Sequence, residues 1–146
     1  MIAVDVLFSG GIVVTMDRRR SLYLDGAVAV RGRDIVAVGP TEQITSRFQA
    51  TETIDCRGLI VTPGLINAHT HVPMSLLRGL ADDLRLDVWL LGYMMPVEHE
   101  HVTPEFVRCG ALLSCAEMIR SGTTTFCDMY YYEEVVAEAT EQAGLR

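Results

Sequence analysis

Residues 59–71 read Leu59-Ile60-Val61-Thr62-Pro63-Gly64-Leu65-Ile66-Asn67-Ala68-His69-Thr70-His71, an apolar run that turns at a Pro-Gly pair and ends in two histidines. The part from Leu65 to His69 predicts a fully buried β-strand. Side chains two positions apart on a strand point to the same face, so we expect the two imidazoles to converge. Active sites of α/β folds lie at the carboxyl ends of strands, and imidazole suits zinc or iron. The stretch therefore indicates half of a metal site.

The residues after this stretch predict alternating helices and strands. A long connection with mixed helical signals covers residues 71–93. Thr103-Pro104-Glu105 is typical of a helix start and Ser121-Gly122 of a helix end. The β-branched run Thr123–Asp128 predicts a second strand, and Glu133–Gln142 predicts a last helix. This order is the opening of an α/β fold with a parallel sheet. A (β/α)₈ barrel takes about 250 residues, so the chain holds about two of its units and the barrel is incomplete.

The helix predicted after Thr103 carries apolar residues at helical spacing, which predict its buried face. The residues of this stripe are Phe106, Cys109, Leu113 and Ala116, widened by Leu112, Cys115 and Ile119.

The first sixty residues are rich in strand signals. The predicted strands are Ala3–Phe8, Ile12–Met16, Ala27–Val30, Ile35–Val38, Thr53–Asp55 and Leu59–Val61. Ser9-Gly10-Gly11 between the first two strands and residues 31–34 between the next two predict hairpins. A short helix is expected to start at Pro40. We therefore divide the chain into a β-rich part, residues 1–60, and an alternating part, residues 61–146.

Composition excludes several classes of protein. Hydrophobic residues make up 49% and charged residues 21% of the 146 residues, which is typical of a globular chain. The net charge of −7 argues against binding to nucleic acid or to anionic lipid. No signal peptide and no apolar run of about 18 residues is visible, so we expect no membrane association. The four cysteines form no C-x-x-C pair, and a reducing cytoplasm fits them best.

Three segments resemble a known family. Residues 62–71 resemble the first metal motif of the amidohydrolase superfamily. Residues 73–84 and the pair Trp89-Leu90 resemble its branch of methylthioadenosine/S-adenosylhomocysteine deaminases, with triazine chlorohydrolases and aminohydrolases nearby. Residues 117–125 resemble the family's second helix and strand. The resemblance implies that residues 61–146 open an amidohydrolase (β/α)₈ barrel (the TIM barrel). It also implies that residues 1–60 are part of a small, composite β-sandwich domain.

The resemblance also implies a mechanism. His69 and His71, with a later histidine and a later aspartate, would hold one divalent metal, zinc before iron. The metal lowers the pKa of its bound water to about 7, and the resulting hydroxide attacks an aromatic carbon that bears an amine or a halide. A further histidine and a glutamate move protons. Of this set only His69 and His71 have counterparts here, so no catalytic residue is assigned and the chain alone is not expected to catalyse.

We therefore expect the amino-terminal portion of a metal-dependent hydrolase of non-peptide C–N bonds, which deaminates an adenine-type nucleoside. The alternatives are a guanine or triazine amino- or chlorohydrolase, and a non-catalytic fragment that needs a partner chain. The expected partners are a small heteroaromatic amine or nucleoside, and either further copies of the chain or the remainder of the fold. A dihydroorotase-like enzyme is a lesser alternative, against which residues 74–89 favour the mononuclear branch.

Asp87 and Trp89 are the candidate substrate-binding residues. In the adenosine-deaminating branch a tryptophan at this place lies near the substrate, and an acid two positions earlier contacts the ribose hydroxyls. A carboxylate is suited to accept hydrogen bonds from two vicinal hydroxyls. The alternatives are ordinary packing for Trp89 and a solvated helix face for Asp87.

Three other features have plainer interpretations. His99-Glu100-His101 is a second H-x-H motif, but it follows no buried strand and predicts a solvated approach to a helix. Asp128 ends a strand and is interpreted as structural. Tyr130-Tyr131-Tyr132 either line the mouth of the barrel or form a subunit contact.

Overall fold

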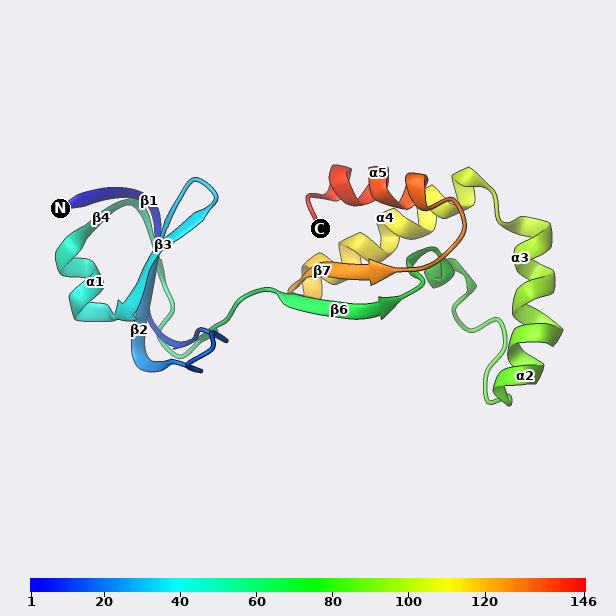
Figure 1. The fold of residues 1–146 in the computed structure, drawn as a ribbon, viewed down its shortest axis with the longest axis horizontal. Helices are drawn as coiled ribbons and strands as arrows, with labels where there is room; N and C mark the ends of the chain where they lie inside the picture. Colours follow the sequence, from blue (N-terminus) through cyan, green and yellow to red (C-terminus); the bar gives the residue numbers. More distant parts are fainter. The chain divides into compact units, whose positions relative to one another are not determined.

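The structure, a computed structural model that describes residues 1–146, divides the chain into two units, Met1–Pro63 and Gly64–Arg146. The first unit is a five-stranded mixed sheet with one short helix (Figure 1). Its elements are β1 (Ile2–Val14), β2 (Leu22–Arg31), β3 (Asp34–Pro40), α1 (Thr41–Arg47), β4 (Phe48–Asp55) and β5 (Ile60–Val61). The sheet order is β3-β2-β1-β4, and β5 pairs with β1 beyond the end of β4.

The hairpin predicted at Ser9-Gly10-Gly11 is wrong, because β1 runs through it without turning. Gly10 has a φ of +81° and is the extra residue of a β-bulge, since Ser9 pairs with Ala27 and Gly11 pairs with Gly26. Glycine supplies this left-handed conformation at no steric cost, so the Gly-Gly pair bulges the strand where a hairpin was expected. The hairpin between β2 and β3 is confirmed.

The core of the first unit lies between the sheet and α1, which starts directly after Pro40 as predicted. Ile44 on this helix is buried in a cluster with residues of β1, β2 and β4. The buried cluster comprises Val4, Leu7, Ala27, Ala29, Ile44 and Phe48.

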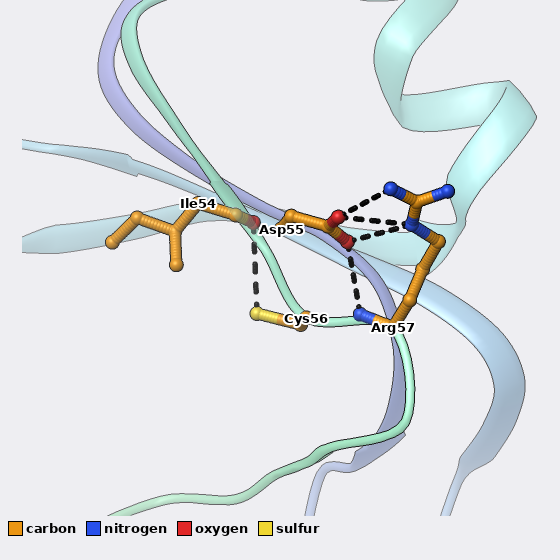
Figure 2. Close-up of polar contacts among 4 residues, drawn as sticks. All are labelled: Ile54, Asp55, Cys56 and Arg57. Atoms are coloured by element: carbon orange, nitrogen blue, oxygen red, sulfur yellow. Dashed lines mark hydrogen bonds and ion pairs between the residues drawn. The ribbon is translucent and has the colours of Figure 1, made fainter.

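The turn between β4 and β5 is held by a local ion pair. Figure 2 shows Arg57 folded back onto Asp55, with Nη2 2.5 Å from Oδ2 and the Arg57 backbone N–H donating to Oδ1 over 3.0 Å. The sulfur of the neighbouring Cys56 faces the carbonyl of Ile54 over 3.6 Å. These hydrogen bonds to Arg57 lower the pKa of Asp55 to about 2.

The second unit opens a parallel α/β fold (Figure 1). Its elements are β6 (Leu65–Thr70), η1 (Val72–Leu77), α2 (Leu86–Trp89), the π-helical turn η2 (Leu90–Met94), α3 (Met95–His101), α4 (Pro104–Ser121), β7 (Thr123–Asp128) and α5 (Glu133–Ala143). β6 and β7 pair in parallel. On the other edge of β7, Arg146 exchanges backbone hydrogen bonds with Thr124 and Phe126, as a third parallel strand would.

The predicted ends of α4 and α5 are confirmed. The side chain of Thr103 accepts from the backbone N–H of Phe106, and Gly122 ends α4 in the left-handed conformation. Gly144 ends α5 in the same way.

The predicted buried stripe of α4 is confirmed only in part: Cys115 is buried, and Phe106 and Leu112 pack against the core. Cys109 and Leu113 are exposed, and the buried face carries small side chains. They are Val107, Gly110, Ala111, Ser114 and Cys115. A β-carbon on Gly110 would lie 2.4 Å from the carbonyl oxygen of Pro73, so η1 passes too close to α4 for large side chains. The buried face of α4 is therefore set more by the close approach of η1 than by the hydropathy of the side chains.

The prediction that residues 65–69 are fully buried is also wrong for this chain. The side chains of Leu65 and Ile66 are 57% and 72% exposed. β6 has a strand partner on one edge only, and a two-stranded sheet leaves a face uncovered. None of the helices combines the length and the hydropathy needed to cross a lipid bilayer.

Candidate metal centre

The two histidines that end β6 converge, as their spacing predicts. Nε2 of His69 lies 3.2 Å from Nε2 of His71, and the two ring planes are 86° apart. Two nitrogens that each bind a tetrahedral zinc at 2.0–2.1 Å are about 3.3 Å apart. The pair therefore has the separation that one zinc requires of two ligands.

The neighbouring strand fixes the ring of His71. Its Nδ1 lies 2.6 Å from the backbone carbonyl oxygen of Met129, the residue after β7. A carbonyl only accepts hydrogen bonds, so Nδ1 carries the proton and, in the neutral ring, Nε2 presents a lone pair. Orientation of a ligating imidazole through its other nitrogen is usual at metal sites. His71 is thus arranged to bind a cation through Nε2.

The donor set fits a divalent metal but supplies only two ligands. Imidazole nitrogens are ligands for zinc and iron. Nowhere in the chain do three or more His, Cys, Asp or Glu side chains converge as a cation site. Structural and catalytic zinc sites use three or four protein ligands, so His69 and His71 make up about half of one.

A cavity of about 430 Å³ opens beside His71. It is mostly apolar and aromatic, with one carboxylate, and so has the character of a small-molecule site. Its lining residues are His71, Met74, Leu86, Trp89, Leu90, Glu98, Met129, Tyr130 and Tyr131.

The structure separates the two residues predicted to bind substrate. Trp89 lies at the end of α2 and lines the cavity with His71. Asp87 is absent from the cavity lining, and its carboxylate pairs with Arg85 through two hydrogen bonds of 2.7 and 3.2 Å. Both side chains of this ion pair are more than half exposed, so the pair is weak and readily exchanged for another partner.

Glu98 is a residue of this site that was not predicted from the sequence. This carboxylate is 8% exposed and accepts a hydrogen bond of 2.8 Å from the hydroxyl of Tyr130. Burial, and then the contact with Glu98, raise the pKa of Tyr130 above its ordinary range. Glu98 is four positions after the buried Met94, and an acid on the buried face of a helical run was the available signal. Of the three tyrosines, Tyr130 and Tyr131 line the cavity.

The second H-x-H motif stays apart from this centre. His99 and His101 lie on α3, which extends to His101, and both are exposed. The solvated interpretation of these histidines is confirmed. Asp128 has structural hydrogen bonds, since its Oδ1 accepts from the hydroxyl of Thr70 and from the backbone N–H of Val72.

Residues 60–146 match the Amidohydrolase family. The chain belongs to this family. The predicted fold class is confirmed. This amidohydrolase chain has an amino-terminal β-rich part, followed by the first β/α units of the (β/α)₈ barrel.

The amidohydrolase chain is similar to deaminases over nearly its whole length. It is 52% identical to 5-methylthioadenosine/S-adenosylhomocysteine deaminase of Syntrophobacter fumaroxidans, over 97% of this chain and 32% of the relative. It is 43% identical to the crystal structure of an adenosine deaminase from Xanthomonas campestris with bound zinc. That likeness has a TM-score of 0.94 and covers 99% of this chain and 33% of the other.

A triazine hydrolase is also similar. The zinc complex of the atrazine chlorohydrolase TrzN from Arthrobacter aurescens is 27% identical, with a TM-score of 0.85, over 97% of this chain and 34% of the other. The amidohydrolase chain thus spans about a third of the length of the relatives that it matches.

Proposed function

We propose that the chain is the amino-terminal part of a metal-dependent amidohydrolase that deaminates an adenine-type nucleoside. His69 and His71 would hold one divalent cation, with zinc as the first candidate and iron as the second. The observation that carries the proposal is the 3.2 Å separation of their Nε2 atoms, with His71 oriented by the carbonyl of Met129. The relative that is 52% identical, a 5-methylthioadenosine/S-adenosylhomocysteine deaminase, supports the substrate class.

The chain's own residues would bind and orient the reactants. When bound, the cation lowers the pKa of a coordinated water toward about 7 and polarises the group under attack. The Met129 carbonyl keeps the proton of His71 on Nδ1 and leaves Nε2 free to bind. Trp89 offers an apolar face beside the cavity to a heteroaromatic base. The carboxylate of Asp87 would give up its hydrogen bonds with Arg85 and accept hydrogen bonds from the ribose hydroxyls.

The same proposal assigns the rest of the chain. Residues 1–60 would contribute to a small β-sandwich domain, and residues 61–146 would be the first two β/α units of the barrel. The exposed apolar side chains of Leu65 and Ile66 support further association of this sheet, with the remainder of the fold or in a homo-oligomer. All four cysteines are unpaired, which supports a reducing cytoplasm.

Triazine hydrolysis is the second candidate. The likeness to a zinc-containing atrazine chlorohydrolase, at 27% identity, favours it. Both reactions replace a substituent on a nitrogen heteroaromatic ring by a hydroxyl group from water, and the amine or halide leaves with the other proton. The metal ligands therefore do not distinguish the two reactions. The shape of the cavity and its contacts with ribose would distinguish the two reactions.

The experiment uses the full-length polypeptide that carries these residues. Bound zinc and iron are measured per chain, and product formation is measured with adenosine, methylthioadenosine, guanine and a chlorotriazine. The test variant is His69→Ala/His71→Ala. The second motif offers a matched control, His99→Ala/His101→Ala, which removes two imidazoles from an exposed helix face.

We expect about one cation per wild-type chain, its loss in the first double variant and its retention in the control. Adenine-type nucleosides should be the best substrates. Equal metal content in both double variants would contradict the assignment of the ligands. If a chlorotriazine is turned over faster than any nucleoside, triazine hydrolysis becomes the proposed function.

A further inference from the structure

The ends of β6 and β7 are tied together by one carboxylate. Oδ1 of Asp128 lies 2.7 Å from the hydroxyl of Thr70 and 2.9 Å from the backbone nitrogen of Val72. Thr70 lies between the two histidines, and Val72 directly follows the second one. A single oxygen atom of β7 therefore binds the residues on both sides of His71, through the side chain of Thr70 and the backbone of Val72.

Other contacts also hold this short segment, and the hydroxyl of Thr70 lies 3.0 Å from the carbonyl oxygen of Cys127 on β7. The backbone of Met129 is joined to Thr70 by a hydrogen bond of 3.4 Å from its nitrogen, and its carbonyl orients the ring of His71. The hydroxyl of Ser114 on α4 donates to the carbonyl of Val72 over 2.7 Å. Of these contacts, only those of Asp128 depend on a side chain of β7.

The second carboxylate oxygen of Asp128 is not used by the fold. Oδ2 is buried and has no hydrogen-bond partner. A buried oxygen without a partner opposes folding, and such exceptions in a native structure call for a specific explanation. Packing alone would be served better by a smaller or an apolar side chain. The hydrogen bonds of Oδ1 to the two residues that flank His71 supply the explanation.

We propose that Asp128 is a positioning residue for the imidazole pair. Its Oδ1 holds the turn from Thr70 to Val72 so that the Nε2 atoms of His69 and His71 keep the separation that one cation requires. This inference rests on the proposed function, since it assigns Asp128 to the same cation site. Asp128 acts through the backbone and the hydroxyl of Thr70, and it does not bind the cation.

Two substitutions at this position separate the accepting oxygen from the charge. Asp128→Ala removes the acceptor, and Asp128→Asn keeps an oxygen in the place of Oδ1. Outer partners of metal ligands are worth about 10–100-fold in metal affinity. We expect Asp128→Ala to weaken zinc binding to the full-length protein by about that factor, measured by competition with a chelator. Asp128→Asn should stay within about threefold of wild type, because it restores the acceptor.

A control variant and a spectrum distinguish positioning from general loss of stability. Ser75→Ala removes a hydrogen bond between η1 and Gly110 in the same unit but does not touch the histidines. It should leave zinc affinity unchanged. The protein loaded with Co²⁺ should show an altered visible spectrum in Asp128→Ala, because the ligand geometry changes. The spectra of Asp128→Asn and Ser75→Ala should be those of wild type.

Thr70→Val provides a second route if Asp128→Ala fails to fold. It removes the hydroxyl that donates to Oδ1, so it should weaken zinc binding in the same direction as Asp128→Ala. Combined with Asp128→Asn, it should weaken binding no more than it does alone, because both changes affect the same hydrogen bond.

Wild-type affinity and spectrum in both Asp128→Ala and Thr70→Val would overturn the inference. So would an Asp128→Asn variant as weak as Asp128→Ala, because the charge would then be the cause. Failure of the proposed function has a different result. In that case the His69→Ala/His71→Ala variant keeps as much metal as the wild-type protein, and both proposals are overturned together.

Discussion

Tyr130 donates its hydroxyl hydrogen to Oε1 of Glu98 over 2.8 Å, although 32 positions separate the two residues in the sequence. The contact joins α3 to the segment that follows β7. Trp89 and His71 line the same cavity, so this hydrogen bond fixes the wall that carries the tryptophan beside the strand ends that carry the histidines. The buried carboxylate therefore has a role in the shape of the cavity.

Tyr130→Phe tests this link. The substitution leaves the carboxylate of Glu98 buried without its donor, and we expect it to destabilise the protein by about 1–3 kcal/mol in denaturant unfolding. Tyr131→Phe is the matched control, since Tyr131 is 50% exposed, and it should change the stability by less than about 0.5 kcal/mol. Equal effects of the two substitutions would contradict the role assigned to Glu98.

Acid stability should depend on the turn between β4 and β5. The hydrogen bonds from Arg57 lower the pKa of Asp55 from 3.8 to about 2. A lowered pKa in the folded state adds stability above the unfolded value, and this contribution is lost as the pH falls from 3.8 toward 2. Asp55→Asn should therefore flatten the fall in stability over this interval, measured by urea unfolding at several pH values. Because both side chains of the pair are more than half exposed, 1 M salt should reduce the difference.

Two glycines test the packing of the second unit. A β-carbon on Gly110 would lie 2.4 Å from the carbonyl oxygen of Pro73, which is backbone and has little freedom to move. Gly110→Ala should destabilise the protein by about 1–3 kcal/mol. A β-carbon on Gly92 in η2 would meet open space, so Gly92→Ala should stabilise by about 0.5–1 kcal/mol. Thermal unfolding that shifts in the same direction for both variants would contradict this account of α4.

The start of α4 depends on the side chain of Thr103. Its hydroxyl oxygen accepts from the backbone N–H of Phe106 over 3.2 Å. Thr103→Ala should cost about 0.5–2 kcal/mol in denaturant unfolding, and Thr103→Ser should recover most of that loss. A serine variant as unstable as the alanine variant would show that the cap contributes little.

The sequence predicted the elements whose signals are local. The cap at Thr103, the left-handed end at Gly122 and the β2–β3 hairpin each depend on a few neighbouring residues, and all are confirmed. The errors arose where distant segments meet. Gly10 forms a β-bulge in β1, and β1 continues as one strand because it pairs with β2 on one edge and with β4 on the other. The buried face of α4 is set by the passage of η1 beside Gly110.

For the candidate site, the sequence by itself determined that His69 and His71 share one face at the end of a strand, because the period of a strand is two residues. It also determined the family resemblance of the residues around them. Only the tertiary structure decided the 3.2 Å between the two Nε2 atoms, the carbonyl that orients His71 and the pairing of Glu98 with Tyr130. Each of these contacts depends on where β7 and the residues after it lie, and no local pattern contains that information.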